Sequence, residues 1–371
     1  MKILAYPTGS AARNFRLDPI AKYIMRGSAN SFYVSLDQMS ENDLGVADVI
    51  VLQQTCSPEK IKLAKEHSTK ENKLLVAELD DYFTIGKDNP RYKEFVANEA
   101  EKWLETLCGV ADVVTTTTDY LANTIKRRLK ANKVKKPVVV LPNYLDMGTW
   151  DLPILGNYSD EIRLLWAGSA SHREDMKFIA PVIKRICEKY PQVKFLYCGD
   201  FKLKPLFEGI NSEYIDAVPF EAWPAKLHSL RADIGVVPLL DNEFNRCKSN
   251  LKYLEFGISG IPSVYSDVVY PETVKDGETG LIAKTEQDFF NKLSLLIEDP
   301  GLRTKIRANA YLDVKTNYDL RNHFLDWLNT YWYHLSKKKA LKLDIGGGRA
   351  PIKGADYVNV DIDPRWGEMI C

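Results

Sequence analysis

The sequence has no long hydrophobic run and no excess of charge of either sign. No apolar stretch approaches the ~20 residues that a membrane-spanning helix needs. Lysine plus arginine and aspartate plus glutamate each number 50 in 371 residues, so net charge gives no reason to expect a nucleic-acid partner. The first apolar stretch ends at Pro7, too early for the hydrophobic region of a signal peptide. These absences predict a cytoplasmic protein.

The cysteines lack any spacing typical of a metal site or a disulfide framework. There are six, with no CxxC and no paired Cys/His pattern, which predicts reduced thiols. Hydrophobic residues make up 45% of the chain and charged residues 27%, which excludes a disordered or fibrous class. At ~100–200 residues per domain, the length predicts about two domains.

Short β-like stretches alternate with longer helical ones in the first 150 residues. The expected strands are rich in Val and Ile and lie at 2–6, 48–53, 74–79, 112–117 and 138–142. The expected helices lie at 58–68, 91–108 and 119–131, and the segment 7–19 is expected to be a loop. This alternation is typical of a parallel sheet with helical crossovers.

The same alternation restarts after a turn-rich segment at 146–161, which we interpret as a linker. The expected strands lie at 163–168, 193–199, 232–239 and 261–266, and the expected helices at 175–189, 221–231, 249–259, 285–298 and 301–316. The segment 319–335 carries an aromatic stripe at helical spacing, which predicts a packing face. The sequence therefore predicts an α/β protein with two Rossmann-like, doubly wound parallel-sheet domains, over 1–150 and 151–318, that face a cleft.

The segment 238–268 has the pattern of a diphosphate site. An expected strand ends at Pro238, a polar loop follows, and Ser249 is an expected N-cap of the next helix. The backbone N–H groups of a helix N-terminus favour an anion, and Lys248 lies beside them in the sequence. About two turns into this helix, Glu255 can accept hydrogen bonds from two ribose hydroxyls.

This segment resembles the donor-binding motif of retaining GT-B glycosyltransferases of the family-4 type. Glu255 matches the second of two motif glutamates, which in that family binds the nucleotide ribose. Cys247 stands where the first glutamate, which contacts the donor sugar, is expected. The segment 164–179 is similar to the family's loop that supplies a basic residue to the donor diphosphate, and Arg173 matches that residue. The resemblance covers residues 1–336, in which 319–336 matches a helix that crosses back to the N-terminal domain.

The resemblance implies a retaining transferase that moves sugar from a UDP- or GDP-sugar to a glycan or lipid-linked acceptor without a metal. It implies catalytic roles for Arg173, Lys248 and Glu255. The implied donor-binding residues are Gly168, Ser169, His172, Asn245, Cys247, Ser249, Asn250, Leu251 and Lys252. His172 fits a hydrogen-bonded loop residue better than a catalytic one.

Candidate acceptor-binding residues follow two expected strands of the N-terminal domain. The first group lies in the loop at 7–19 and comprises Gly9, Ser10, Arg13 and Arg16. The second group is Asp80 and Asp81, a pair that suits acceptor binding, acid–base chemistry, a metal or a structural role. The two arginines are equally well explained as surface residues.

A dense basic run extends from Lys126 to Lys136 with no acidic residue inside it. Such a run fits either contact with an anionic membrane surface or a solvated helix end. We therefore keep peripheral membrane contact as one of two interpretations.

The last segment, 337–371, changes character. An expected strand runs into Gly346, Gly347 and Gly348, and a second expected strand ends at Asp361. This pattern resembles the opening of S-adenosylmethionine-dependent methyltransferases, in which the glycines approach a nucleoside and the acid binds ribose. The segment is too short for a complete domain of this kind, so we expect an incomplete Rossmann-like stub of a longer bifunctional protein.

Two other functions fit the same sequence. The first is a catalytically weak GT-B module that binds a nucleotide-sugar or glycan and positions a downstream methyltransferase, as the replacement at Cys247 would suggest. The second is a nucleotide-sugar 2-epimerase, which needs carboxylates and histidines at several loops, whereas only His172 falls at such a loop.

Overall fold

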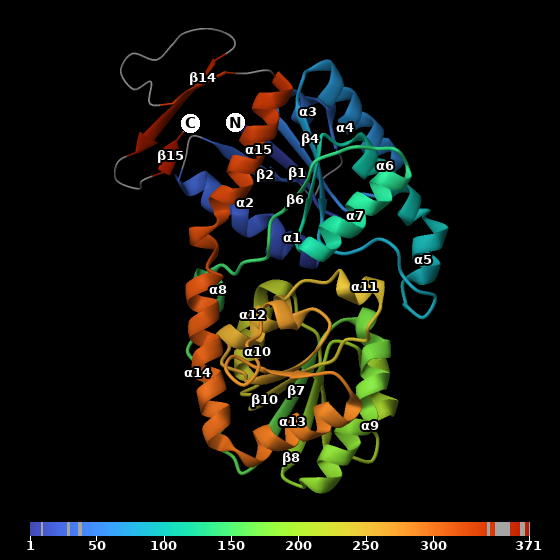
Figure 1. Ribbon diagram of the computed structural model, residues 1–371, viewed down its shortest axis with the longest axis vertical. Coiled ribbons are helices and arrows are strands. Elements are labelled where there is room, and N and C mark those ends of the chain that lie inside the picture. Colours follow the sequence, from blue (N-terminus) through green and yellow to red (C-terminus); the bar gives the residue numbers. More distant parts are fainter. Residues whose placement is uncertain are drawn as a thin grey trace. The chain divides into compact units, whose positions relative to one another are not determined.

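The computed structural model describes residues 1–8, 10–27, 30–35, 39–339, 342–345, 357–363 and 368–370. The chain divides into two compact units (Figure 1). Unit 1 comprises Met1–Phe83, Val96–Pro142 and Leu320–Cys371, and unit 2 comprises Thr84–Phe95 and Asn143–Asp319.

Unit 1 is built around a parallel sheet with strand order β2-β1-β3-β4-β5-β6. The strands are β1 Lys2–Tyr6, β2 Ser31–Val34, β3 Val49–Gln53, β4 Leu74–Leu79, β5 Val113–Thr116 and β6 Val138–Val140. The helices are α1 Ser10–Arg16, α2 Asp18–Gly27, α3 Glu41–Val46, α4 Pro58–Lys70, α6 Ala100–Val110, α7 Asp119–Ala131 and α15 Phe324–Lys339, with the 3-10 turn η5 at Leu320–Asn322. Helix α5, Tyr92–Ala97, spans the division between the units.

Burial explains why these stretches are strands. All residues of β3 and β4 are buried, as expected for central parallel strands covered on both faces. Helix α15 packs against β4 and α2, and it buries Trp327, Leu328, Tyr331 and Leu335. The aromatic stripe is therefore a packing face, as its spacing predicted.

Unit 2 contains a second parallel sheet, with strand order β12-β11-β10-β7-β8-β9. The strands are β7 Ile162–Ala167, β8 Val193–Cys198, β9 Ser212–Ile215, β10 Ile234–Val237, β11 Ser263–Ser266 and β12 Leu281–Ala283. The helices are α8 Met147–Trp150, α9 Arg173–Lys189, α10 Trp223–Ser229, α11 Glu243–Arg246, α12 Leu251–Ile258, α13 Glu286–Glu298 and α14 Pro300–Asn317. The 3-10 turns are η1 Ala170–His172, η2 Phe201–Phe207, η3 Phe220–Ala222 and η4 Tyr270–Glu272.

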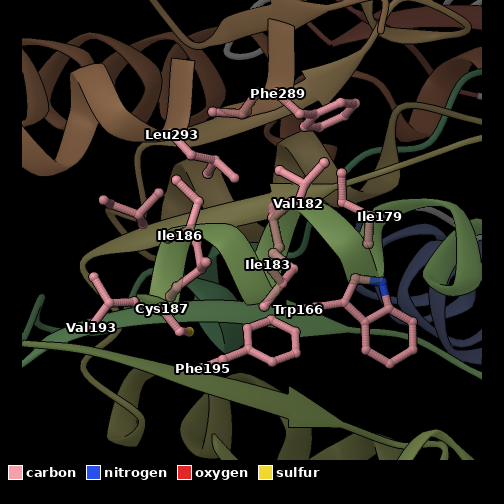
Figure 2. Packing of buried hydrophobic residues seen from close by; sticks show 14 of the residues in the cluster. Trp166, Ile179, Val182, Ile183, Ile186, Cys187, Val193, Phe195, Phe289 and Leu293 are labelled. Atoms are coloured by element: carbon pink, nitrogen blue, oxygen red, sulfur yellow. The ribbon is translucent and has the colours of Figure 1, made fainter. Parts of the chain in front are cut away.

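The core of unit 2 lies between this sheet and the helix pair α9 and α13. Figure 2 shows Val182 and Ile186 of α9 beneath Phe289 and Leu293 of α13, and all four side chains belong to one buried cluster. Phe195 of β8 belongs to the same cluster from the sheet side. This packing fixes the N-terminus of α9 over the end of β7. The expected α/β class with two doubly wound parallel sheets is confirmed.

Several expected elements differ from those observed. The segment 7–19 is not a loop, since α1 begins at Ser10 and α2 at Asp18. The helix expected over 91–108 is divided into α5 and α6 because Glu99 adopts a left-handed conformation, with φ of 47°. The edge strands β2 and β9 were not predicted, because four residues with mixed burial leave little pattern in the sequence.

The two strands expected near the C-terminus are present as β13, Lys342–Ile345, and β14, Tyr357–Asp363. They pair in parallel, and β15, Glu368–Ile370, pairs antiparallel with β14. The glycine run 346–348 lies outside the described residues. The methyltransferase resemblance therefore stays a prediction.

Candidate functional site

The strand order of unit 2 determines where a ligand of this fold would bind. The chain runs from β7 outward to β8 and β9, and then returns to the other side of β7 to form β10, β11 and β12. In doubly wound sheets, ligands bind outside the carboxyl ends of the strands at such a reversal. The loops after β7 and β10 are therefore the candidate site, and they contain most of the predicted donor residues.

The loop after β7 is short and lies against the end of β8. It runs from Gly168 through η1 and ends where α9 begins at Arg173. Gly199, which follows β8, has a φ of 106°, and a Cβ there would collide with the carbonyl oxygen of Gly168. Glycine is needed at this position because the two backbones approach closely.

Arg173 is held by a carboxylate that the sequence did not suggest. Its Nε donates to Oδ2 of Asp200 at 2.9 Å and its Nη2 to Oδ1 at 3.1 Å, in a bidentate ion pair. Asp200 follows Gly199 and is 6% exposed. The pair has no net charge, which reduces the field that Arg173 exerts on an anion. Its role in diphosphate binding stays a prediction.

A second unpredicted carboxylate joins the two loops of the site. Oδ2 of Asp175 lies 2.9 Å from Nδ1 of His172, and Oδ1 accepts hydrogen bonds from the Leu240 backbone N–H at 2.8 Å and from Nδ2 of Asn245 at 2.9 Å. Asp175 is 2% exposed. Through these contacts Asp175 fixes the loop after β10 to the first turn of α9.

His172 lies within electrostatic reach of two lysines of the β10 loop and α12. Burial lowers the pKa of His172, and the ammonium of Lys248 lowers it further. The hydrogen bond to Asp175 raises the pKa, and Lys252 has a smaller lowering effect. Lys248 Nζ lies 4.6 Å from the ring centroid of Phe244. The ring of His172 is therefore influenced by both lysines that the sequence predicted for this site.

Glu255 is a buried, paired carboxylate. It is 2% exposed, and its Oε2 accepts a hydrogen bond from Nζ of Lys252 at 2.6 Å. Glu255 is therefore not a solvated residue on the surface of its helix. Burial raises the pKa of Tyr270, as do Tyr265 and the nearby carboxylates of Glu255 and Asp175.

The start of α12 differs from the expected cap. The N-cap residue is Asn250, whose side chain makes no capping bond and instead donates to Oγ1 of Thr273 at 3.2 Å. Ser249 is not the N-cap, and its Oγ accepts from Nδ2 of Asn143 at 2.9 Å. The N–H groups of the first turn, beginning with Leu251, lack intrahelical acceptors, as in any α-helix.

Cys247 is fully buried at the C-cap of α11, and its N–H donates to the carbonyl oxygens of Glu243 and Phe244. A buried thiol cannot replace a carboxylate as a hydrogen-bond acceptor for a sugar. Asn245 is also buried, at 3% exposure, and it positions the loop through Asp175.

The predicted acceptor residues of unit 1 have different surroundings. Arg13 forms an ion pair with Asp18, between Nε and Oδ2 at 2.7 Å. Arg16 is 1% exposed, and its Nε donates to Oε1 of the fully buried Glu78 at 2.7 Å. Arg16 is therefore neither a surface arginine nor accessible to an acceptor. Ser10 is the first residue of α1, and Gly9 lies outside the described residues.

The carboxylate of Asp80, which follows β4, is influenced by neighbouring charges. The pKa of Asp80 is raised by burial and by the Asp81 and Glu78 carboxylates, while Arg16 opposes the shift. Asp80 accepts a hydrogen bond from Oγ1 of Thr117 through its backbone carbonyl. The predicted role of Asp80 and Asp81 toward an acceptor stays a prediction. No cluster of three or more His, Cys, Asp or Glu residues that could hold a metal was found in the described part of the chain.

The basic run around α7 is partly neutralised in the fold. Arg128 pairs with Glu101 and Glu105 of α6, while Lys126 and Lys130 are exposed. Among the described helices, none combines the length and apolar composition needed to cross a bilayer. Contact with a membrane surface stays a prediction.

Comparison with known proteins assigns the stretch that contains the site. Residues 161–299 match the family of glycosyl transferases group 1. This glycosyltransferase group 1 domain includes every predicted donor residue, from Gly168 to Glu255. A search of curated protein sequences gave no match.

Solved structures show the same fold. HepE from Anabaena, in complex with UDP and glucose, is 14% identical in sequence to this chain, with a TM-score of 0.64. The match covers 90% of this chain and all of the HepE chain. Sucrose-phosphate synthase from Thermosynechococcus elongatus is 12% identical with a TM-score of 0.62, over 91% of this chain and all of that one. TarM is 14% identical with a TM-score of 0.58, and this chain covers 54% of its length. Crystals of an S. aureus TarM variant contained UDP. At this identity the likeness shows a GT-B-like fold.

Proposed function

We propose that this chain is a retaining glycosyltransferase that moves a sugar from a nucleotide-diphosphate-sugar to a glycan or lipid-linked acceptor. The observation that carries the proposal is the group 1 match at 161–299, because it spans all of the predicted donor residues. The donor is expected to be a UDP- or GDP-sugar, and solved structures of HepE, which has this fold, contain UDP or UDP-glucose. Polysaccharide or lipid-linked glycan assembly is the expected setting.

In this proposal Glu255 holds the ribose. An ionised carboxylate has about four acceptor positions, so it can accept from Lys252 and still accept from two ribose hydroxyls. Lys252 lies 2.6 Å from Oε2 and gives the buried carboxylate a partner of opposite charge. We expect Glu255→Gln to weaken donor binding, because the amide keeps one acceptor oxygen and loses the charge.

The diphosphate is expected to bind between the N-terminus of α12 and the lysines beside it. Departure of the diphosphate develops negative charge, and fixed positive groups that stabilise this charge contribute most to the rate in such sites. Lys248 and Lys252 supply that charge, and Arg173 supplies it to the extent that Asp200 allows. We expect Lys248→Met to lower kcat more than it raises KM. No residue is assigned as a nucleophile, and no metal is required in this proposal.

The acceptor is assigned to unit 1, through the predicted residues Asp80, Asp81 and Arg13. Arg16 is excluded from this role by its burial. The strand order of unit 1 reverses between β1 and β3, so the start of α1 at Ser10, which follows β1, belongs to the region where ligands of such sheets bind.

The experiment is a donor assay with the purified chain. UDP-glucose, UDP-N-acetylglucosamine and GDP-mannose are each incubated with the protein, and released nucleoside diphosphate is measured with and without candidate glycan acceptors. Release from one donor that is accelerated by an acceptor supports the proposal, and the product's anomeric configuration by NMR tests retention. Glu188→Gln, an exposed change on α9, serves as a control for Glu255→Gln.

The burial of Cys247 favours one alternative, a binding module with weak catalysis. A carboxylate is missing from the position that contacts the donor sugar in the family that the sequence resembles, and the buried thiol does not replace it. A module of this kind would bind a nucleoside diphosphate but release none from any donor. The donor assay therefore separates the two functions.

A further inference from the structure

We propose that His172 takes up a proton from solvent when a nucleoside diphosphate binds, and that its Nε2–H then donates a hydrogen bond to a diphosphate oxygen. This inference rests on the proposed donor site. It begins with the orientation of the imidazole, which is set by Asp175.

The bond between His172 and Asp175 determines which ring nitrogen carries a hydrogen. Oδ2 of Asp175 lies 2.9 Å from Nδ1, and an ionised carboxylate can only accept hydrogen bonds. Nδ1 therefore carries the hydrogen, and in the neutral ring Nε2 presents a lone pair. The carboxylate cannot rotate away, because its Oδ1 accepts from the Leu240 N–H and from Asn245.

Burial and two lysines favour the neutral form of His172 in the absence of a ligand. Burial lowers the pKa of the ring most, and Lys248 and Lys252, in the loop after β10 and in α12, lower it further, while Asp175 opposes them. The side chain of His172 is 19% exposed, so a proton from solvent can reach it.

The other charged groups next to this cluster are already paired. Arg173, adjacent in the chain, is bound to Asp200, and Lys252 is also bound to Glu255. Each of these two pairs carries no net charge, which limits its influence on the ring.

A diphosphate reverses this balance. It brings at least two negative charges to the cationic side of the ring, and its oxygens can only accept hydrogen bonds. A neutral Nε2 facing such an oxygen would place two lone pairs against each other. Protonation replaces that repulsion with a charge-assisted hydrogen bond. The proton comes from water or buffer, and no covalent bond changes.

The test measures the protons that accompany binding. Titration calorimetry with UDP is performed at pH 7.5 in two buffers that differ in ionisation enthalpy, on wild type and on His172→Gln. Glutamine keeps an uncharged donor but cannot take up a proton. UDP's terminal phosphate, with a pKa of ~6, contributes equally to both proteins. The control is His323→Gln, a change in unit 1 at a side chain that is 30% exposed.

We expect wild type and His323→Gln to take up more protons per UDP than His172→Gln, by up to one. We also expect the dissociation constants of wild type and His323→Gln for UDP to rise more steeply with pH than that of His172→Gln. The difference in slope should be at most about tenfold per pH unit. Equal proton uptake by wild type and His172→Gln, with UDP bound by both, would overturn the inference and leave the proposed function intact. Failure of wild type to bind UDP, GDP or ADP would instead overturn the proposed function.

A second measurement requires no variant. The chain has five histidines, so its Cε1–H NMR spectrum has at most five histidine signals to follow against pH. We expect one signal with a lowered pKa in the free protein to show a raised pKa with UDP present. Five pKa values that UDP leaves unchanged would overturn the inference even if His172→Gln fails to fold.

Discussion

Replacing Asp175 with alanine should destabilise unit 2 more than any surface change on the same helix. The carboxylate is 2% exposed and accepts from Leu240, Asn245 and His172 at 2.8–2.9 Å. A hydrogen bond to a charged group contributes about 1.5–3 kcal/mol, and a buried donor that loses its acceptor costs about 1–3 kcal/mol. Because Asn245 keeps its second bond, to the Leu240 carbonyl at 2.9 Å, we expect a total loss of about 3–5 kcal/mol.

Urea denaturation followed by circular dichroism measures this loss, and Glu174→Ala is the matched control. Glu174 neighbours Asp175 on α9 but is half-exposed, and its ion pair with Lys177, at 2.7 Å, lies at the surface, so its removal should cost less than about 1 kcal/mol. A thermal scan should show the transition of unit 2 lowered by roughly 10 °C in Asp175→Ala. Equal stability of the two variants would refute the claim that Asp175 joins the β7 and β10 loops.

Three further changes test other parts of the fold. Glu78→Ala should cost unit 1 about 3–5 kcal/mol in a urea titration, because it leaves the buried Arg16 without its carboxylate; a loss below about 1 kcal/mol would contradict this. Burial lowers the pKa of His228 from 6.5, so between the folded pKa and 6.5 the unfolded state binds more protons than the folded state. The contribution of neutral His228 to stability should therefore be fully present above about pH 6.5 and be lost as the pH drops through the folded pKa. His228→Gln should reduce this loss in melting scans from pH 7.5 to 5. Gly235→Ala should cost about 1–3 kcal/mol, since its Cβ would lie 2.7 Å from the Phe256 ring and collide with Ser263; an unchanged melting temperature would contradict it.

The central strands could be predicted from the sequence because burial on both faces requires an unbroken apolar run. The runs at 74–79 and 193–199 agree with β4 and β8 to within a residue. The edge strand β2 could not be found in this way, because its four residues have mixed burial. Helices α1 and α2 were missed because Gly9 and Pro7 suggested a loop.

The sequence could suggest candidate loops but not the pairings within them. Local sequence pattern, together with the family resemblance, selected His172, Lys248 and Glu255 as candidates. It could not select Asp200, which pairs with Arg173 from 27 residues away in the sequence. Asp175 had a local signal, its spacing of three residues from His172 at a helix N-terminus, which places both side chains on one face. The burial of Arg16 depends on Glu78, 62 residues distant, and no local pattern indicates that contact.

A thermal-shift experiment with UDP, GDP and ADP on wild type, Glu255→Gln and Glu188→Gln tests the central claim most directly. A diphosphate at a hundredfold excess over its dissociation constant stabilises the protein by about 2.7 kcal/mol, which is roughly 5–10 °C for a domain of this size. The proposed donor site predicts such a shift from one diphosphate in wild type and Glu188→Gln, and a much smaller shift in Glu255→Gln. No shift with any of the three, or an equal shift in all three proteins, would contradict the claim that Glu255 and the loops after β7 and β10 bind a nucleotide-sugar.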